Sequence, residues 1–562
     1  MDTAPRIAGT PIEPPPGFPV SWKEPQHAGL LWEHDAMHFP DQLKPIEEDT
    51  LAVLFGRGFL GAAAALEMPI VQLETARINT WQYQAMVPFM GPPEAMQERG
   101  EKAEANMRAA VAGLREAWEG EYLPQILERL DWWAGVDLGG LSDVELRTHL
   151  EETWDSLGRL WVIHFKTVFP TYVAMSEFDE MYRDLFPDED AFGSYRLLQG
   201  QANKTVESGQ ALWRLSRKAM ASAEVLEVLE TEAAADAVTA LEGSEAGRAF
   251  LGELRRYLDA YGERCEKWSL TTPSWLEDPA PVLKNLKDLV TRPDGEAPAV
   301  TTRQAAEEAD RAIAEARERL EGYPAAAREG FEHLLAAALV AVVLSEDHGF
   351  YIDFRATYAV RQVLLEVGRR LAQAGTVDQR DDVFMLRYDE LLEALAAHPA
   401  SDLKPLVAER AAELDRWRDV APPMQLGTMP PEQPPPNPVL RAMDKLFGTP
   451  VEQTGAANEL HGAPGSSGSV RAVARVVRSL ADAERLQPGE VLVAETTAPP
   501  WTPLFASAGA VVTDTGGILS HCAVVAREYG IPAVVGTGSA TTAISDGDVV
   551  EVDGDAGIVR IG

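Results

Sequence analysis

The pattern of hydrophobic and polar positions gives the chain two textures. From about residue 46 to 420, apolar residues recur with the 3.6-residue period of amphipathic helices, most clearly over 224–261 and 302–344. From Val470 onward, they gather in short valine-rich runs between Gly, Asp and Pro turns, which is typical of β-strands. The predicted strands are 470–477, 490–494, 510–513, 533–535 and 549–552, with one helix at about 521–529.

Two stretches follow neither period. Prolines crowd residues 422–438, and proline at this density forbids helix and favours stiff polyproline II. A short helix is expected at 439–447, and the small residues of 462–469 are the expected pivot of the C-terminal domain. We predict an α+β multidomain protein with an extended arm (1–45), a large, mainly helical body (46–420), a proline-rich linker (421–460) and a β/β/α swivelling domain (461–562).

Composition narrows the classes of function. The 562 residues carry a formal net charge of −38, which argues against nucleic acid and against an anionic membrane surface as partners. The first residues lack the basic and apolar regions of a signal peptide, and the most apolar run, 335–344, is too short to span a bilayer. Two cysteines offer no disulfide framework and no metal cluster. We therefore expect a cytoplasmic protein without a metal site of its own.

The segment 513–536 carries the clearest chemical signal. Gly516 and Gly517 let the backbone turn tightly, Ser520 stands at an N-cap position, and His521 begins a helix. Free amides and the positive end of a helix dipole favour an anion there, and a neutral imidazole has a lone pair that attacks phosphorus. The pattern predicts that His521 carries a phosphoryl group and that its phosphate-binding neighbours are Thr515, Gly516, Gly517 and Ser520.

This segment resembles the phosphohistidine (mobile) domain of the phosphoenolpyruvate-utilising enzymes. The family includes pyruvate phosphate dikinase, phosphoenolpyruvate synthase, rifampicin phosphotransferase and the phenylphosphate synthase α subunit. Its Gly-Gly, two variable positions, Ser-His, helix and Ile-Pro-Ala-Val-Val-Gly tail are all present, and the resemblance covers about 460–562. Leu519 departs from the regulated threonine of the dikinases, and Cys522 replaces the usual small residue after the histidine.

The resemblance implies a dikinase-type phosphotransferase that works through a phosphohistidine intermediate. Full-length relatives carry an ATP-grasp domain, whose signature the sequence does not show. The resemblance therefore implies that a separate ATP-grasp-type subunit, using ATP and Mg²⁺, charges His521; in related enzymes the ATP yields AMP and phosphate. A homodimer is left open.

The helical body more weakly resembles the acceptor-binding domain of rifampicin phosphotransferase. The resemblance rests on 261–264, 270–279, 380–391 and 197–205, although Glu263 stands where the family usually has histidine. It implies that the body binds the acceptor. Ordinary core packing explains most of its aromatic residues equally well. The candidate acceptor-binding residues are Trp161, Phe165, Trp268, Trp275, Glu346, Arg355 and Arg361.

A general base for an acceptor hydroxyl should be a histidine or carboxylate beside an apolar pocket. His348, which ends an apolar helical run, is the first candidate, and His164, between Trp161 and Phe165, is the second. A salt-bridged or solvated cluster at a helix bend is the structural alternative.

Two functions follow from these inferences. In the first, the chain is a phosphotransferase subunit that carries a phosphoryl group on His521 to the hydroxyl of a small, aromatic (phenolic) acceptor. An acidic chain repels charged acceptors such as nucleotides, and the tryptophans supply an apolar pocket. In the alternative, it is a regulatory or scaffolding phosphohistidine protein without a small-molecule acceptor. A deep pocket favours the first, and a flat helical surface favours the second.

Overall fold

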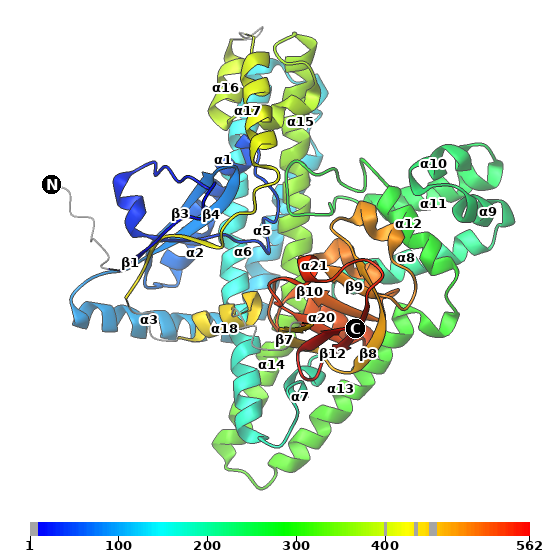
Figure 1. Ribbon diagram of the computed structural model, residues 1–562. Helices are drawn as coiled ribbons and strands as arrows, with labels where there is room; N and C mark the ends of the chain where they lie inside the picture. The colour runs from blue at the N-terminus through cyan, green and yellow to red at the C-terminus, as the bar shows by residue number, and fades with distance from the viewer. Residues whose placement is uncertain (1–8, 398–401, 432–436, 449–457) are drawn as a thin grey trace. The chain divides into compact units, whose positions relative to one another are not determined.

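The computed structural model describes residues 9–397, 402–431, 437–448 and 458–562 (Figure 1). It divides into two compact units, each built from separate stretches of sequence. Unit 1 comprises Met1–Phe169, Trp268–Thr271 and Tyr351–Pro436; unit 2 comprises Pro170–Lys267, Thr272–Phe350 and Asn437–Gly562. The predicted helical body is therefore shared between the two units, and unit 2 also contains the predicted swivelling domain.

A five-stranded antiparallel sheet lies in unit 1, in sequence that we expected to be arm, helix and linker. Its core contains Phe18, Trp32, Tyr83 and Leu426. The described residues of the predicted arm supply the strands Thr10–Ile12 and Leu31–Glu33, which are extended and pair within this sheet. The strand order is β1 (Thr10–Ile12), β5 (Gln425–Met429), β2 (Leu31–Glu33), β4 (Trp81–Pro88) and β3 (Ile70–Ile78).

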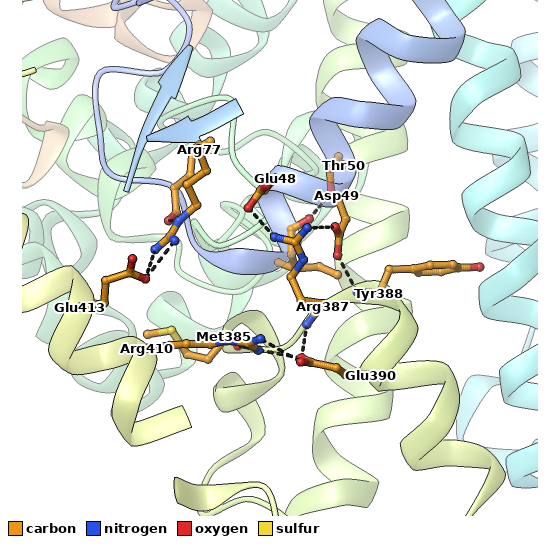
Figure 2. A network of polar contacts seen from close by, with 12 residues as sticks. Glu48, Asp49, Thr50, Arg77, Met385, Arg387, Tyr388, Glu390, Arg410 and Glu413 are labelled. Carbon is orange, nitrogen blue, oxygen red and sulfur yellow. Dashed lines mark hydrogen bonds and ion pairs between the residues drawn. The ribbon is translucent and has the colours of Figure 1, made fainter. Parts of the chain in front are cut away.

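Helices make up the rest of unit 1, and ion pairs tie its distant segments together. Arg77 of β3 pairs with Glu413 at 2.9 Å, and Arg410 forms two hydrogen bonds with the Glu390 carboxylate at 2.6 and 2.8 Å. Figure 2 draws these contacts. The helices are η1 (Pro25–Gly29), α1 (Pro45–Val53), η2 (Leu54–Phe59), α2 (Leu60–Ala65), α3 (Pro93–Ala112), α4 (Leu114–Ala117), η3 (Trp118–Tyr122), α5 (Leu123–Ala134), η4 (Leu138–Gly140), the first part of α6 (Asp143–Leu185), α15 (Thr357–Gln373), η7 (Arg380–Met385), α16 (Tyr388–Ala396) and α17 (Lys404–Trp417).

The helical part of unit 2 is more finely divided than the sequence period suggests. Ser222 and Ser244 each cap a helix by accepting from a backbone N–H three residues on, and the predicted run 224–261 is divided into three helices. The helices are the end of α6, α7 (Gly193–Arg196), α8 (Lys204–Met220), α9 (Ala223–Thr231), α10 (Ala234–Glu242), α11 (Glu245–Tyr261), α12 (Ala280–Val290), η5 (Asp294–Glu296), α13 (Pro298–Leu320), α14 (Ala325–His348) and η6 (Gly349–Ala356), whose last residues belong to unit 1.

An eight-stranded mixed sheet forms the C-terminal part of unit 2. Its central strands are parallel and fully buried, because α19 (Thr502–Phe505) and α20 (His521–Tyr529) cover one face and α21 (Ala540–Ala543) the other. All five predicted strands and the predicted helix are present, which confirms the α+β fold class (Figure 1). The strand order is β6 (Glu459–His461), β13 (Ile558–Ile561), β12 (Val549–Asp553), β8 (Ser469–Val476), β9 (Val491–Ala494), β10 (Ala510–Thr513), β11 (Ala533–Val535) and β7 (Ala463–Ser466).

The glycine- and serine-rich stretch 462–469 is not the pivot that we predicted. Its residues form β7 and the start of β8, and β7 pairs with β11. The remaining connection runs from Gly448, after α18 (Pro438–Phe447), to Asn458, and 449–457 lie outside the described residues, as do the linker residues 432–436. The short 3₁₀ helices η8 (Leu480–Arg485) and η9 (Pro499–Trp501) complete the domain.

Among the described residues, the helical run Ala325–Gln373 is long and apolar enough to cross a membrane by length and composition alone. It extends well beyond the apolar run 335–344 that the sequence shows. In its most apolar window, 56% is buried inside the protein, as in a core helix.

Candidate phosphoryl-transfer site

His521 is the first residue of α20, as the sequence predicts. Ser520 caps the helix, its hydroxyl accepting from the N–H of Ala523 at 3.5 Å, and Gly530 ends it in the left-handed conformation with φ 64°. The His521 side chain is 12% exposed, so the ring is held within the protein with a small opening. Cys522 behind it is buried, and burial raises the pKa of its thiol to about 12, so it is a packing residue rather than a reactive one.

Each nitrogen of the His521 ring faces a different partner. Nδ1 lies 3.5 Å from Oε1 of Glu346 on α14, and Nε2 lies 3.4 Å from the hydroxyl of Thr502 on α19. Phe505, one turn further along α19, is edge-on to the ring at 6.3 Å between centroids. A carboxylate beside Nδ1 favours the tautomer with the proton on Nδ1, which leaves the lone pair on Nε2.

Glu346 is a buried carboxylate with two partners. The hydroxyl of Thr205 donates to its Oε2 at 2.7 Å, and His521 faces its Oε1. Burial by itself raises the pKa of Glu346, but the attraction of His521 and the hydrogen bonds from His521 and Thr205 outweigh burial and lower it. Glu346 is therefore ionised at neutral pH, next to the ring that must react.

A cavity of about 260 Å³ opens beside these residues, and Thr205, Thr502 and Phe505 all line it. Its wall also includes Trp275, which the sequence analysis named, and Arg264. The remaining wall is largely aromatic and apolar, with Leu212, Trp213, Tyr257, Leu289, Pro298, Tyr529 and Ile531. A cavity of this kind suits a small molecule with a flat apolar part.

The glycine turn does not offer its amides as predicted. The N–H of Gly517 donates to the carbonyl of Leu446, and that of Leu519 to the carbonyl of Lys445, both at 2.8 Å. These carbonyls end helix α18, where such groups lack partners within the helix. A Cβ at Gly517 would collide with Lys445, so close approach of α18, rather than of phosphate, explains this glycine.

The other predicted phosphate-binding residues also have partners. Thr515 donates through both its N–H and its hydroxyl to the carbonyl of Glu495 at 3.0 Å, and the hydroxyl of Ser520 caps α20. Gly516 has φ 101°, a conformation that favours glycine. In this arrangement the polar groups against the His521 ring come from Thr502, which faces Nε2, and Glu346, which faces Nδ1.

Several predicted acceptor residues gather in unit 1. Trp161 stacks on Trp268 at 4.7 Å and on His164 at 4.1 Å, with Phe165 against the same ring at 5.6 Å. Nδ1 of His164 lies 2.8 Å from Oδ1 of Asp353. The structure thus joins His164 to an aromatic cluster, with a carboxylate that fixes its ring.

Other predicted residues take structural positions. Arg361 in unit 1 is buried, donates to the carbonyl of Leu270 at 2.8 Å and lies over the Phe384 ring, while Arg355 is half-buried in η6. His348 in unit 2 is buried, and its Nδ1 lies 2.5 Å from the carbonyl of Leu344 in the preceding turn of α14. His348 does not line the cavity, so the structure does not bring the first-choice base to it.

Glu528, two turns along α20 from His521, adds a titratable contact. Its carboxylate accepts from the N–H of Gly200 at 3.3 Å, and burial, with a contribution from Glu346, raises its pKa to about 7. Folded protein therefore binds more protons than unfolded protein between about pH 4.3 and 7. The contribution of Glu528 to the free energy of unfolding is therefore greatest at low pH and is lost as pH rises through 7.

Glu528→Gln is expected to remove this pH dependence. Above pH 7 the variant should be more stable than the natural chain, by on the order of 1–3 kcal/mol, because no buried carboxylate has to ionise. Thermal unfolding at pH 5.5 and 8 measures the effect, with the exposed Glu230→Gln as the control. Equal pH slopes in the Glu528→Gln and control variants would show that Glu528 does not titrate in this range.

Sequence reasoning missed Thr502, Phe505 and Arg264 as site residues. Arg264 stood in the stretch 261–264 that carries the resemblance of the body, and Thr502 lies within the resemblance at about 460–562, which was the available signal. No signal in the sequence marked Phe505, because an apolar residue in a short helix does not indicate which residues surround it.

Two stretches of the chain match families of known proteins. The fourth domain of rifampicin phosphotransferase matches residues 164–346, and the mobile domain of PEP-utilising enzymes matches 486–557. Chondramide synthase cmdD of Chondromyces crocatus is 38% identical over 97% of this chain and 14% of its own length. The uncharacterized phosphotransferase YvkC of Bacillus subtilis is 32% identical over 71% of this chain and 47% of its own.

Rifampicin phosphotransferase of Streptomyces sviceus is 30% identical over 65% of this chain and 40% of its own length. The chain thus spans less than half the length of these curated relatives. Both matched domains contribute to the site, since Glu346 and Arg264 lie in the first and Thr502 and His521 in the second. On this evidence, the chain carries the mobile domain of the PEP-utilising enzymes, together with a domain like the fourth domain of rifampicin phosphotransferase.

Proposed function

We propose that the chain is a phosphotransferase component in which His521 receives a phosphoryl group from an ATP-binding module outside these 562 residues. The group then passes to the hydroxyl of a small aromatic acceptor bound in the cavity of unit 2. ATP and Mg²⁺ are assigned to the charging module, an ATP-grasp-type partner.

The observation that carries this proposal is the position of His521 between a buried carboxylate and a cavity. Nδ1 faces Glu346, while Nε2 faces Thr502, a residue of the cavity wall. The nitrogen with the lone pair is therefore the one beside the space for an acceptor. Trp213, Tyr257, Trp275 and Phe505 line that space with the flat apolar surface that an aromatic acceptor needs.

The residues of the chain divide the chemistry between them. When Nε2 bonds to phosphorus and the bond from phosphorus to the donor oxygen breaks, positive charge develops on the ring, and the Glu346 carboxylate offsets it. In the second step the N–P bond breaks as the acceptor oxygen bonds to phosphorus. Thr205 lines the cavity and donates to Glu346, so the hydroxyl proton has a route to that carboxylate.

Charging and transfer require His521 to visit two places. Since residues 462–469 are part of the sheet, they do not supply the predicted pivot. Two hydrogen bonds, from the N–H groups of Gly517 and Leu519 to the carbonyls of Leu446 and Lys445, join the glycine turn to the end of α18.

The alternative, a signalling phosphohistidine protein, predicts a flat helical surface. The cavity beside His521 favours the enzyme instead.

The test is incubation of the chain with a charging module, ATP, Mg²⁺ and a panel of phenols, followed by mass spectrometry. We expect phosphorylated His521 without acceptor, and an aryl phosphate when the right phenol is present. Phosphorylation of a protein or of pyruvate, with no phenol accepting the group, would contradict the assigned acceptor class.

A further inference from the structure

Two buried N–H groups of the cavity wall have no acceptor among the described residues. They are Nε of Arg264 and Nε1 of Trp275. The side chains are 2% and 3% exposed, so water does not readily replace an acceptor. An unsatisfied buried donor costs about 1–3 kcal/mol, and more when it is charged. Two such donors on one cavity therefore indicate a site whose ligand supplies the acceptors.

The guanidinium of Arg264 makes one long hydrogen bond and one contact with an aromatic ring. One terminal nitrogen donates to the carbonyl of Lys204 at 3.3 Å, and the group lies 5.0 Å from the centre of the Phe350 ring. Burial lowers the pKa of Arg264, whereas the carboxylates of Glu346 and Asp347 act in the opposite direction. Each of these carboxylates already accepts a hydrogen bond, Glu346 from Thr205 and Asp347 from the N–H of Lys204.

We propose that Arg264 and Trp275 form an oxyanion subsite that holds the phosphoryl group during its transfer from His521 to the acceptor. This inference rests on the proposed function and deepens it. A phosphoryl group on Nε2 brings negative oxygens into the same buried region as the Glu346 carboxylate. Those oxygens need donors there, and an arginine fork with a free Nε–H matches their geometry.

The subsite takes part in a balanced step. The N–P bond to His521 breaks, the O–P bond to the acceptor forms, and the equatorial phosphoryl oxygens remain anionic throughout. Arg264 donates to them without changing its own protonation. Its contribution is greatest where charge spreads over these oxygens in the transition state.

The experiment measures binding to the uncharged chain, without ATP, by calorimetry. The probes are inorganic phosphate, phenyl phosphate and benzoate. We expect both phosphates to bind, with affinity at least tenfold weaker in Arg264→Met and several-fold weaker in Trp275→Phe. Trp275→Phe keeps an aromatic ring and removes the N–H, so it tests the site even where Arg264→Met does not fold. The control is Arg255→Gln, which removes a positive charge from an exposed residue outside the cavity wall.

Each result either supports or overturns the proposed subsite. Loss of phosphate and phenyl phosphate affinity in the two variants, but not in the control, supports the subsite. If benzoate alone depends on Arg264 and Trp275, the donors serve an anionic acceptor, and the phosphoryl assignment is overturned. Equal affinities in all variants overturn the subsite altogether. If phosphate binding behaves as expected while His521 is never labelled, the subsite stands and the proposed function fails.

Discussion

His521→Ala is expected to reduce phosphoryl transfer to background. In the proposed function the imidazole is the covalent carrier, so the variant loses the intermediate itself rather than a fraction of the rate. The measurement is incorporation of phosphate into the chain from ATP and the charging module, followed by release to the acceptor. The side chain is only 12% exposed, so the variant loses some packing at the start of α20, and thermal unfolding checks that the fold persists.

The matched control is His461→Ala, which removes the other histidine of residues 458–562. His461 ends β6 and pairs with Glu459 at 3.0 Å. The His461→Ala variant should be phosphorylated on His521 at the natural rate. Charging of His521→Ala at even a tenth of the natural level would show that another residue carries the group.

Sequence alone was most informative where local signals suffice. Helix α20 is delimited by Ser520 and Gly530, whose roles at helix ends are local. Strands β10 and β11 are short, fully buried runs of β-branched and small residues, which turns delimit clearly. In these places, capping, periodicity and turn chemistry agree, so the prediction and the structure coincide.

Pairing between distant segments was not predictable in the same way. Strand β5 lies among prolines and pairs with β1 and β2, nearly 400 residues earlier, so nothing near residues 425–429 indicates a sheet. The glycine turn shows the same limit. Local sequence correctly requires glycine at 516 and 517, but the partner of the turn is α18, about 70 residues earlier.

The positions of the two candidate groups on α14 were not predictable for a related reason. Spacing along a helix places Glu346 and His348 on different faces, and we preferred the histidine by its chemistry. The structure instead directs Glu346 to His521, across 175 positions of sequence. His348 faces a carbonyl of its own helix. Only the packing of α14 against the mobile domain decides between them.

Glu346→Gln is expected to slow both charging of His521 and transfer to the acceptor by about a hundredfold or more. The amide keeps the size of the side chain but removes the charge that offsets the ring during phosphorylation. It also no longer selects the tautomer with the proton on Nδ1. The phosphohistidine isomer is an independent readout, since phosphorus NMR distinguishes the two ring nitrogens. The natural chain should be labelled on Nε2 alone, and the variant should show a share on Nδ1.

Asp347→Asn is the matched control, because it makes the same change of charge one residue away. Asp347 accepts from the N–H of Lys204 at 2.7 Å, which the asparagine oxygen preserves. Burial raises the pKa of Asp347 to about 6, so the comparison is made above that pH, where the side chain is ionised and the variant removes its charge. This variant should keep transfer within a few-fold of the natural rate. Natural rates in Glu346→Gln, with labelling on Nε2 alone, would reduce Glu346 to a structural partner of Thr205. Equal losses in both variants would point to a general electrostatic effect on α14. A loss confined to Glu346, accompanied by the change of isomer, identifies its carboxylate as the group that sets the reactive nitrogen of His521.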